Sequence, residues 1–140
     1  MKAEFFMPMI PPTVTAQEHK VTVIKGKPVY YDPPELQKAK VKITGALYRA
    51  MPEDWQTITG PCRLIVKWLF PISGNHKDGE WKYTKPDTDN LQKALKDGMT
   101  ALGYWKDDAL VCSEIVEKFW AAKPGIYIRL EELECGKVKQ

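Results

Sequence analysis

The chain has 140 residues, of which 44% are hydrophobic and 28% charged, which favours one soluble globular domain with its own buried core. Its net charge of +3 is compatible with a phosphate-rich partner but does not require one. Three widely separated cysteines argue against a disulfide framework and favour a reducing cytoplasm. The sequence has neither an apolar run long enough to span a membrane nor the pattern of a signal peptide, so a cytoplasmic protein is expected.

The first part of the chain is rich in residues that favour β-structure. Residues 3–9 are predicted to form a short strand, which ends before Pro11-Pro12. Residues 21–24 and 28–31 flank Lys25-Gly26-Lys27, a pattern typical of a β-hairpin. We therefore expect one strand and one hairpin in this region.

An amphipathic helix is predicted to follow the hairpin. Asp32 is a suitable N-cap, Pro33 suits the first helical position, and Glu35 lies where a capping box places its acid. The apolar residues that follow recur at helical spacing, which indicates a helix packed on a sheet. These residues are Leu36, Ala39, Ile43, Leu47 and Ala50.

The middle of the chain is predicted to contain a strand, a loop and a second helix. Residues 62–70 alternate as a half-buried strand, whereas residues 72–86 lack an apolar period and are expected to form a long mobile loop. A helix is expected from about Asn90 to Gly103, because glycine commonly ends helices. Its predicted buried stripe is Leu91, Ala94, Leu95, Gly98 and Leu102.

The last two predicted strands, residues 109–120 and 126–133, complete the fold. The order of elements predicts one α/β (α+β) domain over residues 1–135, with a mixed sheet and helices mainly on one face. Residues 136–140 are expected to be a basic tail.

Acidic residues gather at both ends of the second predicted helix. Asp87 and Asp89 lie at its start, with Lys93 one turn further on, and Asp107 and Asp108 follow its end. Carboxylates held together repel one another unless positive charge lies among them, and their hard oxygen atoms suit Mg²⁺ or Mn²⁺. The set therefore indicates metal-assisted cleavage of nucleic acid.

A purely structural explanation is also open for each of these residues. Asp89 and Gln92 have the spacing of a capping box, and Lys93 has the spacing that pairs it with Asp89 or Asp97. A cap needs only one acid, so this explanation is weaker for the whole set.

The two acidic pairs are separated by the length of the helix. A helix of about 13 residues is ~20 Å long. Asp87 and Asp108 can meet within one subunit only if residues 103–108 fold back along the helix. Otherwise they meet across a dimer interface, and the sequence leaves both arrangements open.

The ordered combination of these residues resembles a known family. Asp87-Thr-Asp-Asn-Leu-Gln-Lys93, followed by Asp97 and Gly103-Tyr-Trp-Lys-Asp-Asp108, is similar to the signature of RusA-type Holliday junction resolvases. The resemblance implies a small homodimeric endonuclease that binds four-way DNA junctions. It further implies paired symmetric cuts in DNA recombination and repair, made with Mg²⁺ or Mn²⁺.

The resemblance also implies roles for individual residues. Asp87, Asp89 and Asp108 correspond to the metal-binding catalytic carboxylates, and Lys93 to the catalytic basic residue beside them. Whether Asp107 or Glu114 also contributes to the metal site stays open.

The predicted loop interleaves lysines with aromatic residues. Lysines suit the phosphate backbone, and aromatic rings can stack on unpaired bases, although a loop that contacts no ligand is an equally open interpretation. Members of the family often have arginines immediately before the first aspartate, where this chain has Lys85-Pro86. The candidates for DNA contact are Lys77, Lys82, Lys85, Trp81 and Tyr83.

We therefore expect a dimeric, metal-dependent endonuclease that resolves Holliday junctions and, as members are often phage-borne, a prophage origin. The alternative is a non-catalytic architectural protein that binds branched DNA. The four intact residues of the signature, Asp87, Asp89, Lys93 and Asp108, speak against it. An enzyme that acts on small phosphate esters is a third hypothesis, which the basic aromatic loop disfavours.

Overall fold

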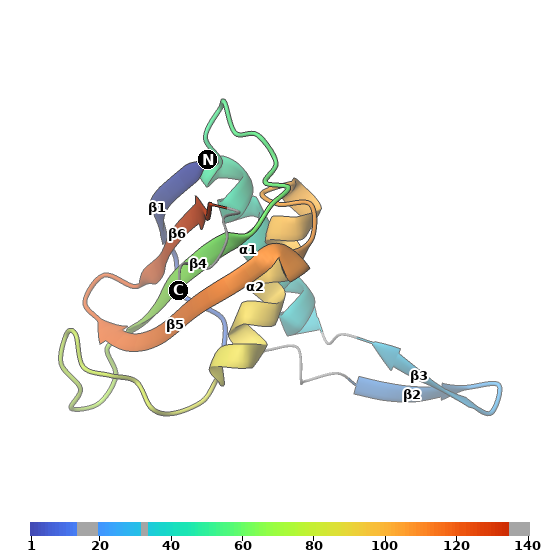
Figure 1. Cartoon of the computed structure of the whole chain (residues 1–140). Coiled ribbons are helices and arrows are strands. Elements are labelled where there is room, and N and C mark those ends of the chain that lie inside the picture. Colours follow the sequence, from blue (N-terminus) through green and yellow to red (C-terminus); the bar gives the residue numbers. More distant parts are fainter. Residues whose placement is uncertain (14–19, 32–33, 135–140) are drawn as a thin grey trace, which may run out of the picture.

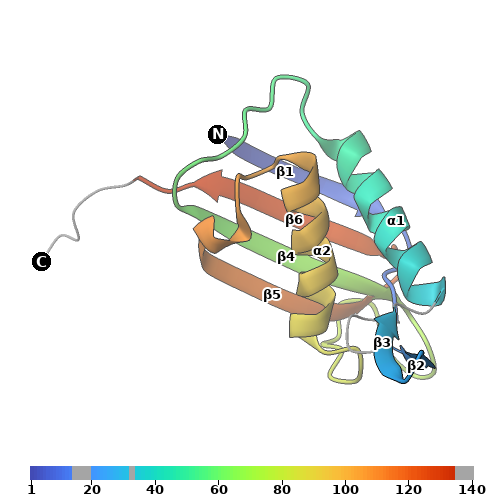
Figure 2. The same cartoon turned by 90° about the vertical axis from the view of Figure 1, so that its right-hand side faces the viewer.

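The computed structural model describes residues 1–13, 20–31 and 34–134. Its body is a four-stranded sheet in the order β1-β6-β4-β5, with two helices on one face (Figure 1; Figure 2). A short 3-10 helix, η1 (Asp108–Leu110), precedes the edge strand β5. The strands of the body are β1 (Lys2–Pro8), β4 (Cys62–Pro71), β5 (Val111–Ala121) and β6 (Gly125–Glu132), and the helices are α1 (Pro34–Ala50) and α2 (Thr88–Leu102).

The sheet is mixed. β4 pairs with β6 in antiparallel and with β5 in parallel orientation, and β1 pairs antiparallel with β6. Parallel neighbours need a crossover connection, and α2 provides it between β4 and β5. The predicted fold class, an α+β domain with a mixed sheet and its helices on one face, is confirmed.

The hydrophobic core lies between the sheet and the two helices. Along β4, buried and partly buried residues alternate over the whole strand, as the sequence predicted. Alternate residues point to opposite faces of a strand, so one face of β4 is turned to the helices. Its buried residues are Cys62, Leu64, Val66, Trp68 and Phe70.

The helices α1 and α2 approach each other closely at Gly98. A Cβ atom at this position would lie 3.1 Å from the hydroxyl oxygen of Thr44 and 3.2 Å from Leu47 Cδ1, so a side chain would crowd the interface. The predicted apolar stripes largely face the core, although Ala39, Ala50 and Leu102 are only partly buried. No helix in the described part of the chain is long and apolar enough to cross a membrane.

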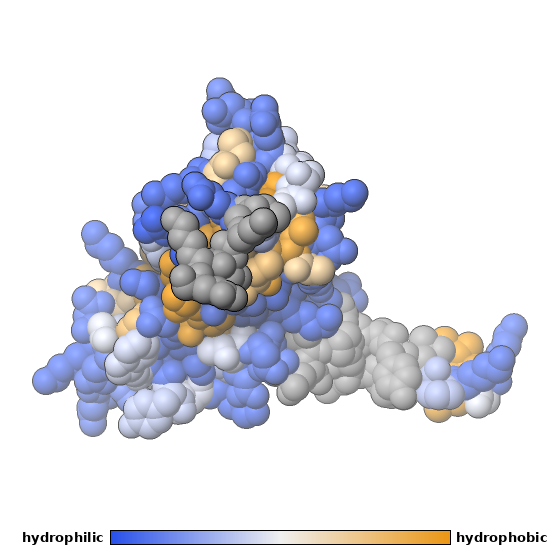
Figure 3. Space-filling model, viewed as in Figure 1, coloured by the Kyte–Doolittle hydropathy of each residue, from blue (hydrophilic) through white to orange (hydrophobic). Residues whose placement is uncertain are grey.

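The predicted hairpin is present and forms a separate two-stranded sheet of β2 (Lys20–Ile24) and β3 (Lys27–Tyr31), which projects from the body (Figure 1). Its turn has positive φ values at Lys25 and Gly26, as tight hairpin turns require. Hydrophobic surface is visible on this projection among hydrophilic residues (Figure 3). The predicted cap at residues 32–33 and the tail at residues 136–140 lie outside the described residues.

Candidate active site

The first acidic pair lies at the N-terminal end of α2. The helix begins at Thr88 and Asp87 occupies its N-cap position, but the Asp87 side chain makes no capping hydrogen bond. The alternative explanation of Asp89 and Gln92 as a capping box is therefore wrong: Asp89 lies within the first turn, and Gln92 forms hydrogen bonds elsewhere. The Asp87 carboxylate lies 3.5 Å from the Lys85 ammonium group.

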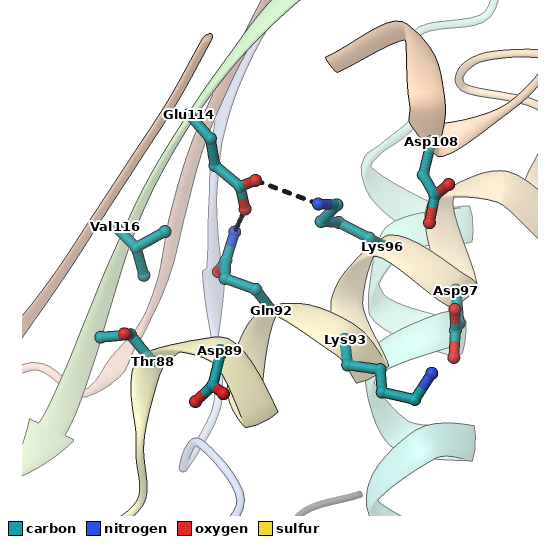
Figure 4. A pocket seen from close by; sticks show the side chains of 9 residues that line it. All are labelled: Thr88, Asp89, Gln92, Lys93, Lys96, Asp97, Asp108, Glu114 and Val116. Atoms are coloured by element: carbon teal, nitrogen blue, oxygen red, sulfur yellow. Dashed lines mark hydrogen bonds and ion pairs between the residues drawn. The ribbon is translucent and has the colours of Figure 1, made fainter. Parts of the chain in front are cut away.

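The chain folds back along α2 after the end of the helix. Gly103 has a φ of 83°, and the N–H groups of Gly103 and Tyr104 donate to carbonyl groups of the last helical turn at 3.1 and 3.0 Å. This is the pattern of a Schellman motif, in which glycine reverses the chain direction without steric cost. The return segment carries Asp108 back towards the middle of α2, within one chain (Figure 4).

Two buried aromatic residues hold the return segment in place. The hydroxyl group of Tyr104 donates to the Leu47 carbonyl of α1 at 2.5 Å, and burial raises the pKa of this hydroxyl well above its usual range. Trp105 Nε1 donates to the hydroxyl oxygen of Thr100 at 2.7 Å, and the backbone of Trp105 pairs with Ile58. The position of Asp108 therefore depends on core packing.

The two acids of the second pair have different surroundings. Asp107 Oδ1 accepts a hydrogen bond from the Ala109 N–H at 2.8 Å and so caps η1. Asp108 faces α2 and lies beside Lys96 and Asp97 (Figure 4). Asp107 is thus engaged in local structure, and Asp108 is the acid that faces the pocket.

A pocket of about 450 Å³ lies between α2, η1 and the first part of β5 (Figure 4). Three of the predicted catalytic residues, Asp89, Lys93 and Asp108, line it together, whereas Asp87 is not among its lining residues. Asp87 is the direct neighbour of Thr88, which does line the pocket, so it lies close to the rim. The lining residues are Thr88, Asp89, Gln92, Lys93, Lys96, Asp97, Asp108, Glu114 and Val116.

A chain of hydrogen bonds that sequence reasoning missed runs along the wall of the pocket. Gln92 Oε1 accepts from the buried Trp68 Nε1 at 2.7 Å, and Gln92 Nε2 donates to Glu114 Oε2 at 2.7 Å. Lys96 Nζ donates to the other oxygen of Glu114 at 3.0 Å (Figure 4). The i,i+4 spacing of Gln92 and Lys96 was the available signal, because it places both on one helix face.

The other charged groups of the pocket have free side chains. Asp89, Lys93, Asp97 and Asp108 form no ion pair or side-chain hydrogen bond with any residue that the structure describes. Unpaired carboxylate oxygens are ligands that Mg²⁺ takes together with several waters, so the donor chemistry fits a hard divalent cation. Within the described ranges, however, no three acidic, histidine or cysteine side chains converge into a ready-made metal cluster.

The loop of residues 72–86 contains no helix or strand, as predicted, but part of it is attached to β5. The Gly79 N–H donates to the Trp120 carbonyl, and the Trp120 N–H donates to the Glu80 carbonyl, both at 2.8 Å. The rings of Trp81 and Phe119 stack with centroids 4.4 Å apart. The sequence predicted a long mobile loop, whereas the structure shows a loop that is held to β5 by these contacts.

The five candidates for DNA contact differ in their exposure. Trp81 is 59% and Tyr83 88% exposed, and Lys77 and Lys85 are also exposed. Lys82 is only 8% exposed, and so does not present its ammonium group to a phosphate as the sequence suggested. Burial lowers the pKa of Lys82 from its usual value, and the nearby charge of Lys118 lowers it further.

The fold and the pocket define a small α+β protein in which carboxylates and lysines gather beside a β-α-β unit. The family model for endodeoxyribonuclease RusA matches residues 9–131, and the chain therefore belongs to this family. The family resemblance seen in the sequence signature is confirmed.

Two relatives extend over most of the chain. The chain is 29% identical to a protein described as crossover junction endodeoxyribonuclease rusA from Lactococcus phage r1t, over 95% of this chain and 100% of that protein. It is 28% identical to the uncharacterized protein YqaN of Bacillus subtilis strain 168, over 81% of this chain and 86% of YqaN. The match to the phage protein thus extends from one end of that protein to the other.

Proposed function

We propose that this protein is a divalent-metal-dependent endonuclease that resolves four-way DNA junctions by paired cuts in recombination and repair. The observation that carries the proposal is the pocket shared by Asp89, Asp108 and Lys93 in a chain of the RusA family. The described activity of the phage r1t relative supports a junction as the substrate.

In this proposal Asp87, Asp89 and Asp108 hold Mg²⁺ or Mn²⁺. A bound divalent ion lowers the pKa of a water molecule and neutralises charge on the phosphate. The free ammonium group of Lys93, in the same pocket, is suited to stabilise negative charge on a phosphate oxygen. Lys96 is less free for this role because Glu114 accepts its hydrogen bond.

The exposed residues of the loop are the proposed DNA contacts. Lys77 and Lys85 offer charge to the phosphate backbone, and Trp81 and Tyr83 offer ring faces to unpaired bases. The loop runs directly into α2, so these residues lie on the segment that leads to the pocket. Lys82 is left out of this set because its side chain is buried.

We also propose that the active form is a homodimer. A four-way junction has approximate two-fold symmetry and needs two opposed cuts, and a closed dimer presents two identical sites with that symmetry. Each subunit supplies one such pocket among its described residues. Light scattering is expected to report twice the 16.0 kDa mass of the chain, and a monomer that still makes paired cuts would contradict the proposal.

The test is cleavage of a synthetic four-way junction, compared with a linear duplex, in the presence of Mg²⁺, Mn²⁺ or a chelator. We expect metal-dependent cuts at symmetric positions on the junction only, and no cuts by the Asp89→Asn variant. Tight binding without cleavage at any metal concentration would instead support the architectural alternative. Hydrolysis of small phosphate esters without junction cleavage would support the third hypothesis.

A further inference from the structure

Lys118 of β5 holds the backbone immediately before the first acid of the signature. Its Nζ donates to the Thr84 carbonyl at 2.6 Å and to the Pro86 carbonyl at 2.7 Å. Hydrogen bonds from a charged donor are stronger than those between neutral groups. Lys118 therefore fixes the end of the loop against β5. Asp87 follows directly after Pro86, the last residue that Lys118 holds.

A second lysine, Lys82, holds the carbonyl of Lys85, which lies between the carbonyls of Thr84 and Pro86. Lys82 Nζ donates to the Lys85 carbonyl at 2.8 Å and to the Thr84 hydroxyl oxygen at 2.5 Å. The Lys82 backbone N–H donates to the carbonyl of Lys118 at 3.0 Å, so the two lysines are also tied to each other. The carbonyls of residues 84, 85 and 86 are thus all bound to ammonium groups.

Asp87 is restrained on both sides through its backbone. On the helix side, its carbonyl accepts from the Leu91 N–H at 3.1 Å, and on the loop side Lys118 holds the Pro86 carbonyl. Its carboxylate is half exposed and forms an ion pair with the more exposed Lys85. The direction in which the Asp87 side chain leaves the backbone is therefore determined by the restraints on residues 84–91.

We propose that Lys118 is a positioning residue: by holding the carbonyls of Thr84 and Pro86, it orients Asp87 for the metal binding that the proposed function assigns to this acid. Lys82 supports it by holding the carbonyl of Lys85. This inference rests on the proposed function, because it assumes that Asp87 binds the metal. Groups that orient a metal ligand affect metal affinity without touching the ion, and their loss typically costs about 10–100-fold in affinity or activity.

The test compares two variants of the full chain. Lys118→Met keeps the length of the side chain but removes its donors, whereas Lys118→Arg keeps both charge and donors. Lys123→Met is the control, because it removes the same charge from an exposed lysine in the turn that follows β5. Mn²⁺ binding to the protein without DNA is measured by calorimetry, and junction cleavage is titrated with Mg²⁺.

We expect Lys118→Met to weaken Mn²⁺ binding and to raise the Mg²⁺ concentration for half-maximal cleavage by about 10–100-fold. Lys118→Arg should restore part of this loss, and Lys123→Met should behave as wild type. Junction affinity in chelator should be unchanged in all three variants. In an Asp87→Asn background, Lys118→Met should cause no further loss of Mn²⁺ affinity, since the carboxylate that it positions is already absent.

Three results would overturn the inference. The first is an unchanged metal requirement in Lys118→Met, and the second is an equal further loss in the Asp87→Asn background, which would indicate a general structural role. The third is a weaker junction affinity with a salt dependence lower by about one unit, which would indicate a direct phosphate contact. If Lys118→Met does not fold, Lys118→Gln replaces it in the same measurements.

A different result would refute the proposed function itself. A wild-type protein that cuts no junction at any metal concentration would refute the endonuclease proposal. The Mn²⁺ calorimetry, which needs no cleavage, would still decide whether Lys118 acts through Asp87.

Discussion

Gln92 Nε2 donates a 2.7 Å hydrogen bond to Glu114 Oε2, which ties the helix of the family signature to the strand that follows Asp108. The same amide accepts from the buried Trp68 indole at 2.7 Å. One side chain thus connects α2 with β4 and β5. α2 carries Asp89, and β5 begins directly after η1, which carries Asp108.

Replacing Gln92 is expected to destabilise the fold. Gln92→Met leaves the buried Trp68 N–H without an acceptor, which typically costs about 1–3 kcal/mol in the free energy of unfolding. Chemical denaturation measures this loss, with Lys93→Met as a control at the adjacent exposed position. A Gln92→Met protein as stable as wild type would show that the hydrogen bonds of Gln92 contribute nothing to the stability of the fold.

The adjacent acids Asp107 and Asp108 are expected to respond differently to the same change. Asp108→Asn should abolish junction cleavage while junction binding survives or becomes tighter, because a negative charge next to DNA phosphate is removed. Asp107→Asn keeps an acceptor for the Ala109 N–H and should cut normally, whereas Asp107→Ala should lose about 0.5–2 kcal/mol of stability. Cleavage assays and thermal denaturation of the three variants check this. Normal cleavage by Asp108→Asn would contradict the assignment of Asp108 as a catalytic metal ligand.

Replacing Lys85 is expected to affect DNA binding, whereas replacing Lys82 is expected to affect stability. Lys85→Ala should weaken junction binding and lower its salt dependence by about one unit, as the loss of one phosphate contact does. Lys82→Ala should instead lower the free energy of unfolding, because the ammonium group is buried over the rings of Phe70 and Trp120 at 5.1 and 4.5 Å. Binding titrations at several salt concentrations, together with denaturation, separate the two effects. An unchanged salt dependence in Lys85→Ala would remove this residue from the DNA contacts.

Cys62 is expected to make stability fall at alkaline pH. Burial raises the pKa of its thiol from 9.0 to about 11, with smaller contributions from Cys112 and Glu132. The native state therefore keeps a proton that the unfolded chain loses, so this stabilisation is fully present below pH 9 and is lost as the pH rises towards 11. Cys62→Ala should show a shallower decline of unfolding free energy over this range, measured by chemical denaturation.

The pH dependence, and not the absolute stability, is the quantity to compare for Cys62→Ala, since this change also removes buried volume. Cys112→Ala, at an exposed position, should decline almost as steeply as wild type. The raised pKa of Tyr104 acts in the same direction as that of Cys62, and the lowered pKa values of Lys82 and Lys118 act in the opposite direction. All three groups are present in both cysteine variants, so the comparison isolates the thiol. An identical decline in Cys62→Ala and wild type would contradict the prediction.

The sequence by itself determined the features that depend on neighbouring residues. Alternation along residues 62–70 predicted β4 because side chains in a strand point alternately to its two faces. Gly103 predicted the end of α2 because glycine adopts the left-handed backbone conformation without steric cost. The spacing of Asp87, Asp89 and Lys93 around the start of that helix likewise followed from the sequence, and so did the family.

The resemblance singled out Asp108 from the sequence, but only the tertiary structure gives the physical reason why Asp108 faces the pocket and Asp107 does not. Asp107 and Asp108 are adjacent in sequence, but the buried side chains of Tyr104 and Trp105 fix the return segment so that Asp108 lines the pocket. Contacts that set this direction come from Leu47 and Ile58, far away in the chain, where no local pattern reveals them.

The same holds for the lysines of the loop. Lys82 and Lys85 have the same charge and lie three positions apart, yet one is buried and the other exposed. The ammonium group of Lys82 can be buried because carbonyl groups and aromatic rings from distant strands surround it. Burying a charge is favourable only when such partners are in place, and it is the folded chain that brings them there.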